Sequence, residues 1–230
     1  MNLLVLLNGS PRGERSNTHK MLRRIAQGWE RGGGNVAKIF HLAQPGEIAR
    51  AIQDFETCQA MVLGMPLYTD SMPALVLDFL DAWMPVALDR KRAGTMPMLG
   101  FLVQSGFPEA LHSRPLERYW KKLATRLEAN YAGTIVRGSG ESLQAMPDIA
   151  CKKLWEQLQS LGEQLAGGQS FSPEILRRIA GRERFSGGMA LLMRFVIRLP
   201  MAQFYWRSMM KKNGTRKCHS AASYGHPYQP

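Results

Sequence analysis

The chain alternates between short, continuously apolar runs and longer segments in which apolar residues recur every three or four positions. Residues 3–7, Leu-Leu-Val-Leu-Leu, form the first such run. A run this apolar is typical of a strand covered on both faces, as in a parallel sheet. The segment after it has apolar residues at helical spacing, such as Met21, Leu22 and Ile25, and ends at three glycines.

The same alternation continues to about residue 166. It predicts strands at residues 3–7, 35–41, 60–64, 97–103 and 131–136. It predicts helices at residues 18–31, 47–56, 73–88, 115–130 and 147–166. Strands that alternate with helices in this way indicate an α/β fold with a doubly wound, five-stranded parallel sheet. Such sheets bind ligands beyond the carboxyl ends of their strands, where the polar loops after the first, third and fourth strands would meet in a 2-1-3-4-5 strand order.

The loop after the first strand is rich in small polar residues. From residue 8 to residue 18 it reads Asn-Gly-Ser-Pro-Arg-Gly-Glu-Arg-Ser-Asn-Thr, and it leads into the first helix. Hydroxyl groups, free backbone N–H groups and the helix dipole together favour a phosphate group at such a position. The alternative interpretation is that Ser16 or Thr18 only caps the helix.

Three phosphate chemistries are excluded by what this loop lacks. It has no G-x-G-x-x-G fingerprint of a dinucleotide site, and no G-K-[ST] sequence of a P-loop nucleotidase. It contains no cysteine that could act as a phosphatase nucleophile. The loop therefore predicts a terminal phosphate that is held and not transferred.

Two motifs, in the right order, resemble one known family. Gly-Ser-Pro-Arg at residues 9–12 with Ser-Asn-Thr at residues 16–18 resembles the phosphate loop of the NADPH-dependent FMN reductase-like flavoproteins, a branch of the flavodoxin-like superfamily. Pro-Leu-Tyr at residues 66–68, with Ser-Met-Pro-Ala at residues 71–74, is similar to the P-x-Y loop of that family and the helix that follows it. The resemblance covers about residues 1–170 and implies a flavodoxin-like sheet with the order 2-1-3-4-5.

The resemblance also implies a cofactor, a reaction and a set of site residues. The cofactor would be FMN, with hydride transfer from NADPH or NADH to the flavin and then to a quinone, flavin or similar small acceptor. The residues implied for the phosphate are Ser10, Arg12, Ser16, Asn17 and Thr18. The residues implied for the isoalloxazine ring are Pro66, Leu67, Tyr68 and Thr69 on one side and Gln104, Ser105 and Gly106 on the other. No catalytic side chain is assigned; Tyr68 is a weak candidate for a proton or hydrogen-bond donor, and packing within its loop is the alternative.

Two other functions stay open at this point. A flavodoxin-type electron carrier would bind FMN without turning over a nicotinamide, although such carriers are usually acidic. A flavin-binding scaffold would use the C-terminal part of the chain to dock a membrane or a partner.

The C-terminal part differs in charge from the rest of the chain. The formal net charge of the whole chain is +12, and residues 171–230 hold eleven Lys and Arg against two Glu, a net charge of +9. We therefore expect a flavodoxin-like domain at residues 1–170 and a basic helical extension at residues 171–230. A solvated basic surface is the simplest interpretation of the extension. No nucleic-acid-binding signature accompanies the charge, so we expect no nucleic-acid partner.

Residues 189–210 are largely apolar but are interrupted by three arginines and a proline. This pattern favours two helices that cover an apolar surface, such as that of a second copy in a homo-oligomer, for example a dimer. Peripheral contact with a membrane through an interfacial helix is the alternative.

The three cysteines, Cys58, Cys151 and Cys218, are far apart in the sequence. Their spacing suggests reduced thiols in a cytoplasmic protein and gives no support for a disulfide framework or an iron–sulfur cluster. The N-terminus lacks the features of a signal peptide, and we expect no bound metal.

Overall fold

The computed structural model describes residues 2–188 and residue 208. The chain divides into two compact units, residues 1–184 and residues 185–230, and the sheet belongs to the first. The predicted apolar helices at residues 189–210 lie outside the described residues, apart from Ser208. Within the described part of the chain, no helix combines the length and the apolar character needed to cross a membrane.

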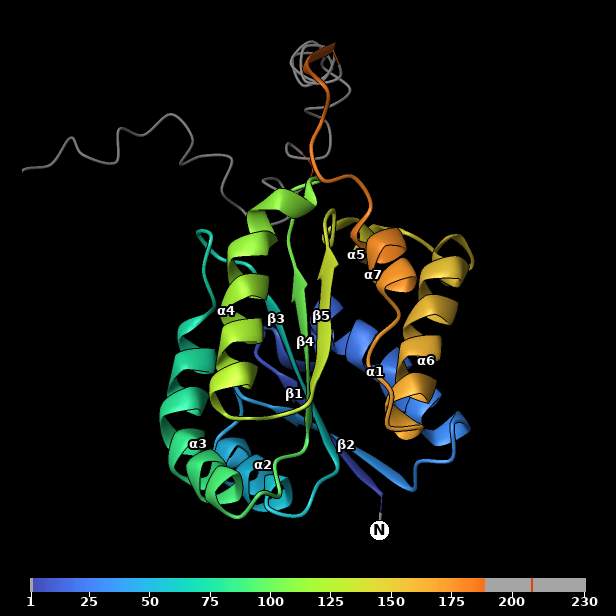
Figure 1. The fold of residues 1–230 in the computed structure, drawn as a ribbon. Helices are drawn as coiled ribbons and strands as arrows, with labels where there is room; N and C mark the ends of the chain where they lie inside the picture. The colour runs from blue at the N-terminus through green and yellow to red at the C-terminus, as the bar shows by residue number, and fades with distance from the viewer. Residues whose placement is uncertain (1, 189–207, 209–230) are drawn as a thin grey trace, which may run out of the picture. The chain divides into compact units, whose positions relative to one another are not determined.

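Five parallel strands form one sheet (Figure 1). They are β1 (Leu3–Asn8), β2 (Val36–His41), β3 (Ala60–Pro66), β4 (Met98–Gln104) and β5 (Tyr131–Arg137). Their spatial order, β2-β1-β3-β4-β5, confirms the predicted order. All residues of β1 and β3 are buried, which explains why these two strands are continuously apolar up to Asn8 at the end of β1. At the carboxyl edge of the sheet, Asn8 is level with His41 of β2 and Gly64 of β3.

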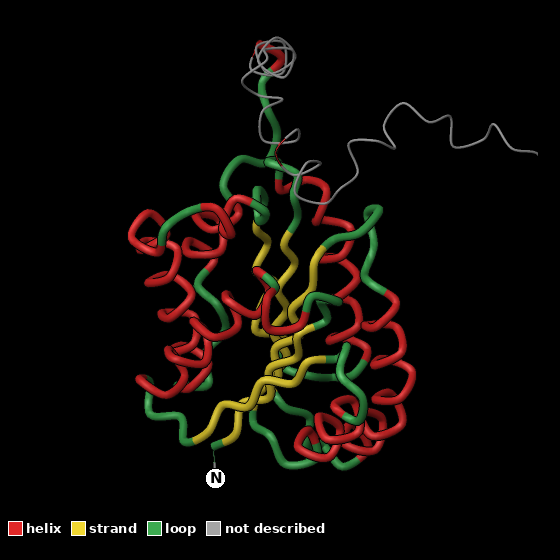
Figure 2. The backbone as a smooth tube through the Cα atoms, turned by 180° about the vertical axis from the view of Figure 1, so that it is seen from behind, coloured by secondary structure: helices red, strands yellow, loops and turns green. Residues whose placement is uncertain are grey.

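Helices cover both faces of the sheet, as Figures 1 and 2 show. On one face lie α2 (Glu47–Phe55), α3 (Ala74–Arg92) and α4 (Arg114–Arg126), and on the other lie α1 (Asn17–Arg31), α6 (Lys152–Ala166) and α7 (Pro173–Ala180). Each layer has its own apolar core, with Phe79, Trp83 and Trp120 in the first and Trp29 and Phe171 in the second. The predicted doubly wound α/β fold is therefore confirmed.

The helices α1 and α6 approach so closely that their contact requires glycine. A Cβ atom on Gly28 would overlap the carbonyl oxygen of Gln159, and one on Gly162 would overlap the carbonyl oxygen of Ile25. This packing holds α1 firmly against α6 and the sheet. The first turn of α1, which follows the polar loop after β1, consequently has a fixed position at the sheet edge.

The observed elements differ from the predicted ones mainly at their ends. β3 extends to Pro66, beyond the predicted end at residue 64. The helix α3 extends to Arg92, beyond the predicted end at residue 88, and contains Pro85 on its exposed side. A carbonyl group that the proline leaves without a donor can be hydrated there. The last predicted helix begins as a 3-10 segment, Asp148–Cys151, and a short α5 (Ser142–Ala145) that the sequence did not predict precedes it.

Candidate functional site

The loop between β1 and α1 lies against the end of β3. The N–H group of Gly9 donates a hydrogen bond to the carbonyl oxygen of Gly64 at 2.8 Å. A Cβ atom on Gly9 would overlap the side chain of Val76, and one on Gly64 would come 2.9 Å from the methyl carbon of Thr18. Glycine at both positions therefore lets the loop and the first turn of α1 lie close to the sheet.

Ser16 is the N-cap residue of α1. Its Oγ accepts a hydrogen bond from the backbone N–H of His19 at 3.0 Å and donates one to the carbonyl oxygen of Gly13 at 2.7 Å. This is the capping role that the sequence left open as an alternative. The hydroxyl group of Ser16 is thus already used by hydrogen bonds within the protein.

The first turn of α1 keeps hydrogen-bond donors that the protein does not use. Asn17 and Thr18 occupy the first two helical positions, whose N–H groups have no intrahelical acceptor, and neither finds another acceptor among the described residues. The hydroxyl group of Thr18 is also buried without a hydrogen-bond partner, which costs about 1–3 kcal/mol. Three unused donors at the positive end of a helix dipole suit an anion such as phosphate.

A segment to which the sequence assigned no role, residues 138–145, reaches this turn. The side-chain amide of Asn17 donates to the carbonyl oxygen of Gly140 at 2.7 Å. The guanidinium group of Arg12 lies 3.4 Å from the carboxylate of Glu141, and both side chains are half exposed. The segment between β5 and α6 therefore borders the candidate phosphate site, and its glycines were its only signal in the sequence.

The loop after β3 forms a tight two-residue turn. The backbone groups of Tyr68 and Ser71 pair with each other at 2.9 and 3.0 Å. Between them, Thr69 and Asp70 have φ angles of 49° and 59°. A two-residue turn with positive φ at both central positions strongly prefers Asn and Gly, and a β-branched residue there is strained. The side chain of Tyr68 is 45% exposed beside this turn.

The loop after β4 lies beside the loop after β3. The N–H group of Leu67 donates to the carbonyl oxygen of Gln104 at 2.8 Å, and Pro66 is level with Gln104 in the sheet. The carbonyl oxygen of Ser105 accepts a hydrogen bond from the N–H of Gly140 at 2.6 Å. The residues predicted to surround a flavin ring are thus brought together on two adjacent loops.

An imidazole that the sequence reasoning missed links these two loops. His112 stacks on Phe107 with 4.4 Å between the ring centroids. Its Nδ1 lies 3.8 Å from the carboxylate of Asp70, and its Nε2 lies 3.6 Å from the carboxylate of Glu109. A single histidine in a loop carries no spacing signal, so only the folded chain shows its position between two carboxylates.

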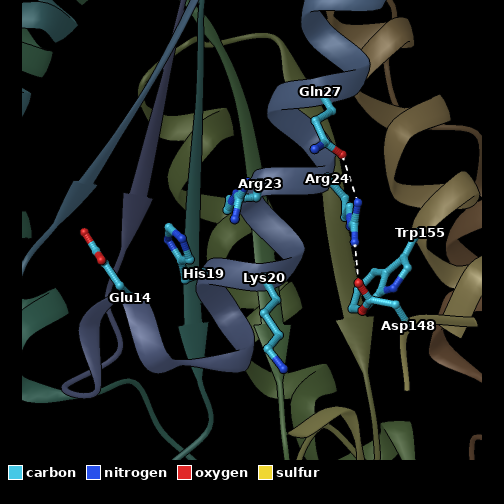
Figure 3. A pocket seen from close by; sticks show the side chains of 8 residues that line it. All are labelled: Glu14, His19, Lys20, Arg23, Arg24, Gln27, Asp148 and Trp155. Atoms are coloured by element: carbon cyan, nitrogen blue, oxygen red, sulfur yellow. Dashed lines mark hydrogen bonds and ion pairs between the residues drawn. The ribbon is translucent and has the colours of Figure 1, made fainter. Parts of the chain in front are cut away.

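A pocket of about 560 Å³ lies along α1 (Figure 3). It is lined by Glu14, His19, Lys20, Arg23, Arg24, Gln27, Asp148 and Trp155. Arg24 is paired with Asp148 at 3.3 Å. Burial is the main cause that lowers the pKa of His19, and the neighbouring His41 and Arg23 act in the same direction. Positive charge therefore continues along α1 beyond its first turn.

The two described cysteines, Cys58 and Cys151, are buried free thiols. Burial raises the pKa of Cys58 to about 12, so that it is a thiol and not a thiolate at neutral pH. Across residues 2–188 and 208, no group of three His, Cys, Asp or Glu side chains is arranged to hold a metal ion.

A family profile described as "Flavodoxin-like fold" matches residues 1–85, which include the loops after β1 and β3. Together with the strand order, this match decides the fold family. The chain has the flavodoxin-like fold. The flavodoxin-like fold that the two loop motifs implied is thereby confirmed.

Solved structures with this flavodoxin-like fold include three reductases. An NADPH-quinone reductase from P. pentosaceus is 19% identical, with 72% of this chain and 98% of that chain covered and a TM-score of 0.51. An NAD(P)H:quinone oxidoreductase from Methanothermobacter marburgensis is 11% identical (71% and 96% covered, TM-score 0.53). An FMN-dependent NADH-azoreductase from Bacillus anthracis is 12% identical (72% and 100% covered, TM-score 0.51). At these identities the likeness establishes the fold. No curated protein matches the chain closely enough to count as a relative.

The residues at this edge of the flavodoxin-like sheet fit an FMN phosphate. The hydroxyl group of Thr18 and the N–H groups of Asn17 and Thr18 are unused donors, and Arg12 adds a nearby positive charge. A phosphate group accepts hydrogen bonds from such a set. On the adjacent loop Pro66 and Leu67 are buried, so contact with a flat ring there would come mainly from the backbone of this loop.

Proposed function

We propose that this chain binds FMN at the carboxyl edge of its sheet and acts as an NAD(P)H-dependent oxidoreductase on a small acceptor. The observation that carries the proposal is the first turn of α1, where the Thr18 hydroxyl is buried without a partner beside two unused N–H groups. The names of the similar structures, two quinone reductases and an FMN-dependent azoreductase, support the same general function.

In this proposal different parts of the chain bind the two ends of the cofactor. The phosphate accepts hydrogen bonds from the first turn of α1, with Ser10, Arg12 and Ser16 shaping the loop around it. Ser16 acts through its cap, because its hydroxyl group is already bonded to His19 and Gly13. The ring lies between the loop at residues 66–69 and the loop at residues 104–106.

Bound FMN would supply hydride transfer from NADPH or NADH to a quinone, flavin or similar acceptor. The role of the polypeptide is to hold the ring between the two loops and to deliver a proton to the acceptor. His112 is the candidate for proton delivery, because its imidazole lies between the carboxylates of Asp70 and Glu109 at the border of both loops. Tyr68, half exposed on the neighbouring turn, is a second hydrogen-bond donor to the acceptor.

The remaining proposals concern the oligomeric state of the protein, its localisation and its contacts with a partner or a membrane. From the family resemblance we propose a cytoplasmic homo-oligomer, and light scattering of the full chain in solution tests its assembly. The basic residues 171–230 are proposed to contact a partner or an anionic membrane surface. Sedimentation with anionic vesicles of the full chain and of a chain without residues 185–230 tests the membrane contact, because α7 belongs to the core of the first unit and is kept. Equal sedimentation of both chains would count against it.

The function is tested with the full chain, FMN, NADH or NADPH, and a benzoquinone. We expect quinone-dependent oxidation of the nicotinamide that requires FMN. Bound FMN without any oxidation of NADH or NADPH would instead indicate an electron carrier. A chain that binds no FMN would contradict the proposal.

A further inference from the structure

One side-chain amide, that of Asn8, fixes the conformation of the loop between β1 and α1. Asn8, the last residue of β1, is fully buried. Its Oδ1 accepts a hydrogen bond from the N–H of Ser10 at 3.1 Å, and its Nδ2 donates to the carbonyl oxygen of Gly13 at 2.8 Å. The start and the middle of the loop are therefore hydrogen-bonded to the same amide group.

These two bonds fix the orientation of the amide. A flipped amide would place its NH₂ group against the N–H of Ser10 and its oxygen against the carbonyl of Gly13, which are two repulsive contacts. In the fixed orientation, Nδ2 also faces Nδ1 of His41 at 3.0 Å. An amide NH₂ group only donates, so Nδ1 of His41 has to be the unprotonated acceptor nitrogen of a neutral imidazole.

The His41 ring is buried and has one carboxylate and one imidazole close to it. His41 is the last residue of β2 and is 6% exposed. Its Nε2 lies 3.9 Å from the carboxylate of Glu14, whose side chain is mostly exposed. The His19 ring is 5.0 Å away between centroids, and Nδ1 of His19 is buried without a partner. Figure 3 shows His19 between Glu14 and Arg23, so the basic side chains of α1 adjoin this pair of histidines.

The other charged groups near the end of β2 belong to the opposite face of the sheet. Phe40 packs in the core under α2 and α3, whereas Ile39 packs under α1. Because side chains alternate along a strand, His41 lies on the α1 side. Arg50 of α2 lies over the ring of Phe40 and pairs with Glu47. Those two charges therefore face away from the imidazole.

We propose that His41 is a positioning residue for the FMN phosphate. Its neutral imidazole orients Asn8, Asn8 holds the loop, and the loop presents the first turn of α1 to the phosphate. Protonation of His41 would turn its acceptor nitrogen into a donor that opposes the amide of Asn8. Acid therefore weakens binding of the phosphate end more than binding of the ring end. This inference rests on the proposed function, since it concerns the same cofactor.

The first test compares FMN and riboflavin binding to the full chain by flavin fluorescence between about pH 8 and about pH 5. We expect FMN affinity to fall by about tenfold or more, and riboflavin affinity to change much less. His41→Asn keeps an acceptor oxygen at the position of Nδ1 but does not titrate. Its FMN affinity is expected to lie within about threefold of the natural chain at the higher pH and to lose most of the acid dependence. A phosphate monoester itself gains a proton at about pH 6. The pH dependence of FMN affinity that remains in His41→Asn therefore belongs to the phosphate group and is the baseline for the natural chain.

A second variant tests the acceptor nitrogen of His41, and NMR tests its tautomer directly. His41→Phe keeps a ring but removes the acceptor, so FMN affinity should fall about tenfold throughout the pH range. Nitrogen-15 NMR of the histidines without flavin should show His41 with its proton on Nε2. A proton on Nδ1 at about pH 8, or the same acid loss in His41→Asn as in the natural chain, would overturn the inference. A natural chain that binds no FMN would contradict the proposed function, whereas the NMR result would still decide the state of His41.

Discussion

The two ends of the candidate flavin site are built in different ways. At the phosphate end, the side chains that face the sheet are buried, namely those of Asn8, Ser10, Ser16, Asn17 and Thr18. Asn8 and Ser16 among them are hydrogen-bonded within the protein. The hydroxyl group of Thr18, Oδ1 of Asn17 and Nδ1 of His19 are buried there without a hydrogen-bond partner. At the ring end, Tyr68 and Phe107 are about half exposed, and His112 lies between two carboxylates. The buried end is suited to holding a ligand permanently, and the open end is suited to exchanging substrates.

This difference separates affinity from turnover. Substitutions at the phosphate end should change how tightly FMN is held and leave the rate of the loaded protein almost unchanged. Substitutions at the ring end should do the opposite. A substitution that changes FMN affinity and the turnover rate together would contradict this separation of the two ends.

The largest effect is expected at the ring end. His112→Gln keeps a polar side chain but removes the group that would carry a proton to the acceptor. Since general acid catalysis typically contributes about 100-fold or more, quinone reduction at saturating FMN should slow by about that factor. FMN affinity should stay the same, as measured by flavin fluorescence. Unchanged turnover would remove His112 from the proposed mechanism.

The next effect is expected at the phosphate end and has a matched control. Thr18→Val removes the unpartnered hydroxyl, so FMN affinity should fall about tenfold while the stability of the flavin-free chain stays equal or rises by about 1 kcal/mol. Thr134 is a second buried threonine, but its hydroxyl is bonded to Tyr131 at 2.7 Å. Thr134→Val should therefore lose about 1 kcal/mol of stability and keep its FMN affinity. Equal behaviour of the two variants in both measurements would contradict this prediction.

A smaller effect is expected in the turn beside the ring. Thr69→Asn combined with Asp70→Gly places the preferred residues at the two positions of positive φ. We expect stability to rise by about 1 kcal/mol and the melting temperature by about 2–4 °C. Gly46→Ala is the opposite control: Gly46 has a φ of 79° and open space at its Cβ position, so alanine should cost about 1 kcal/mol. No change in either variant would mean that positive φ carries no cost in this chain.

The smallest effect concerns the exposed ion pair beside the phosphate. Glu141→Gln removes a carboxylate that lies 3.4 Å from Arg12. FMN affinity should rise about threefold at low ionic strength, and the gain should shrink as salt screens the charges. Glu30→Gln changes the net charge equally on an exposed position at the far end of α1 and should have no such effect. An equal gain from Glu30→Gln would assign the change to net charge alone.

Much of the fold follows from local patterns in the sequence. Buried strands such as β1 are continuous apolar runs, and α1 has one apolar stripe that ends at glycines, so both could be predicted. The polar loop between them could be assigned to a phosphate because small donors at a helix start have a local physical meaning. Pro85 was no obstacle to α3 because it lies on an exposed side, and sequence alone does not reveal that side.

The rest of the site depends on contacts between distant parts of the chain. Asn17 and Gly140 are 123 positions apart, and His112 meets Asp70 only because two loops after neighbouring strands are adjacent. The sequence could not tell which hydroxyl, that of Ser16 or that of Thr18, is used by the protein. That distinction depends on the path of the loop back to Gly13, which places an acceptor beside Ser16 and none beside Thr18.

The most direct measurement is the ratio of FMN affinity to riboflavin affinity for the full chain at about neutral pH. The two ligands differ only in the phosphate, so the ratio reports the phosphate end alone. Charge-assisted hydrogen bonds to a buried helix start should favour FMN by about 100-fold. Equal affinities would contradict the assignment of the first turn of α1 as the phosphate site.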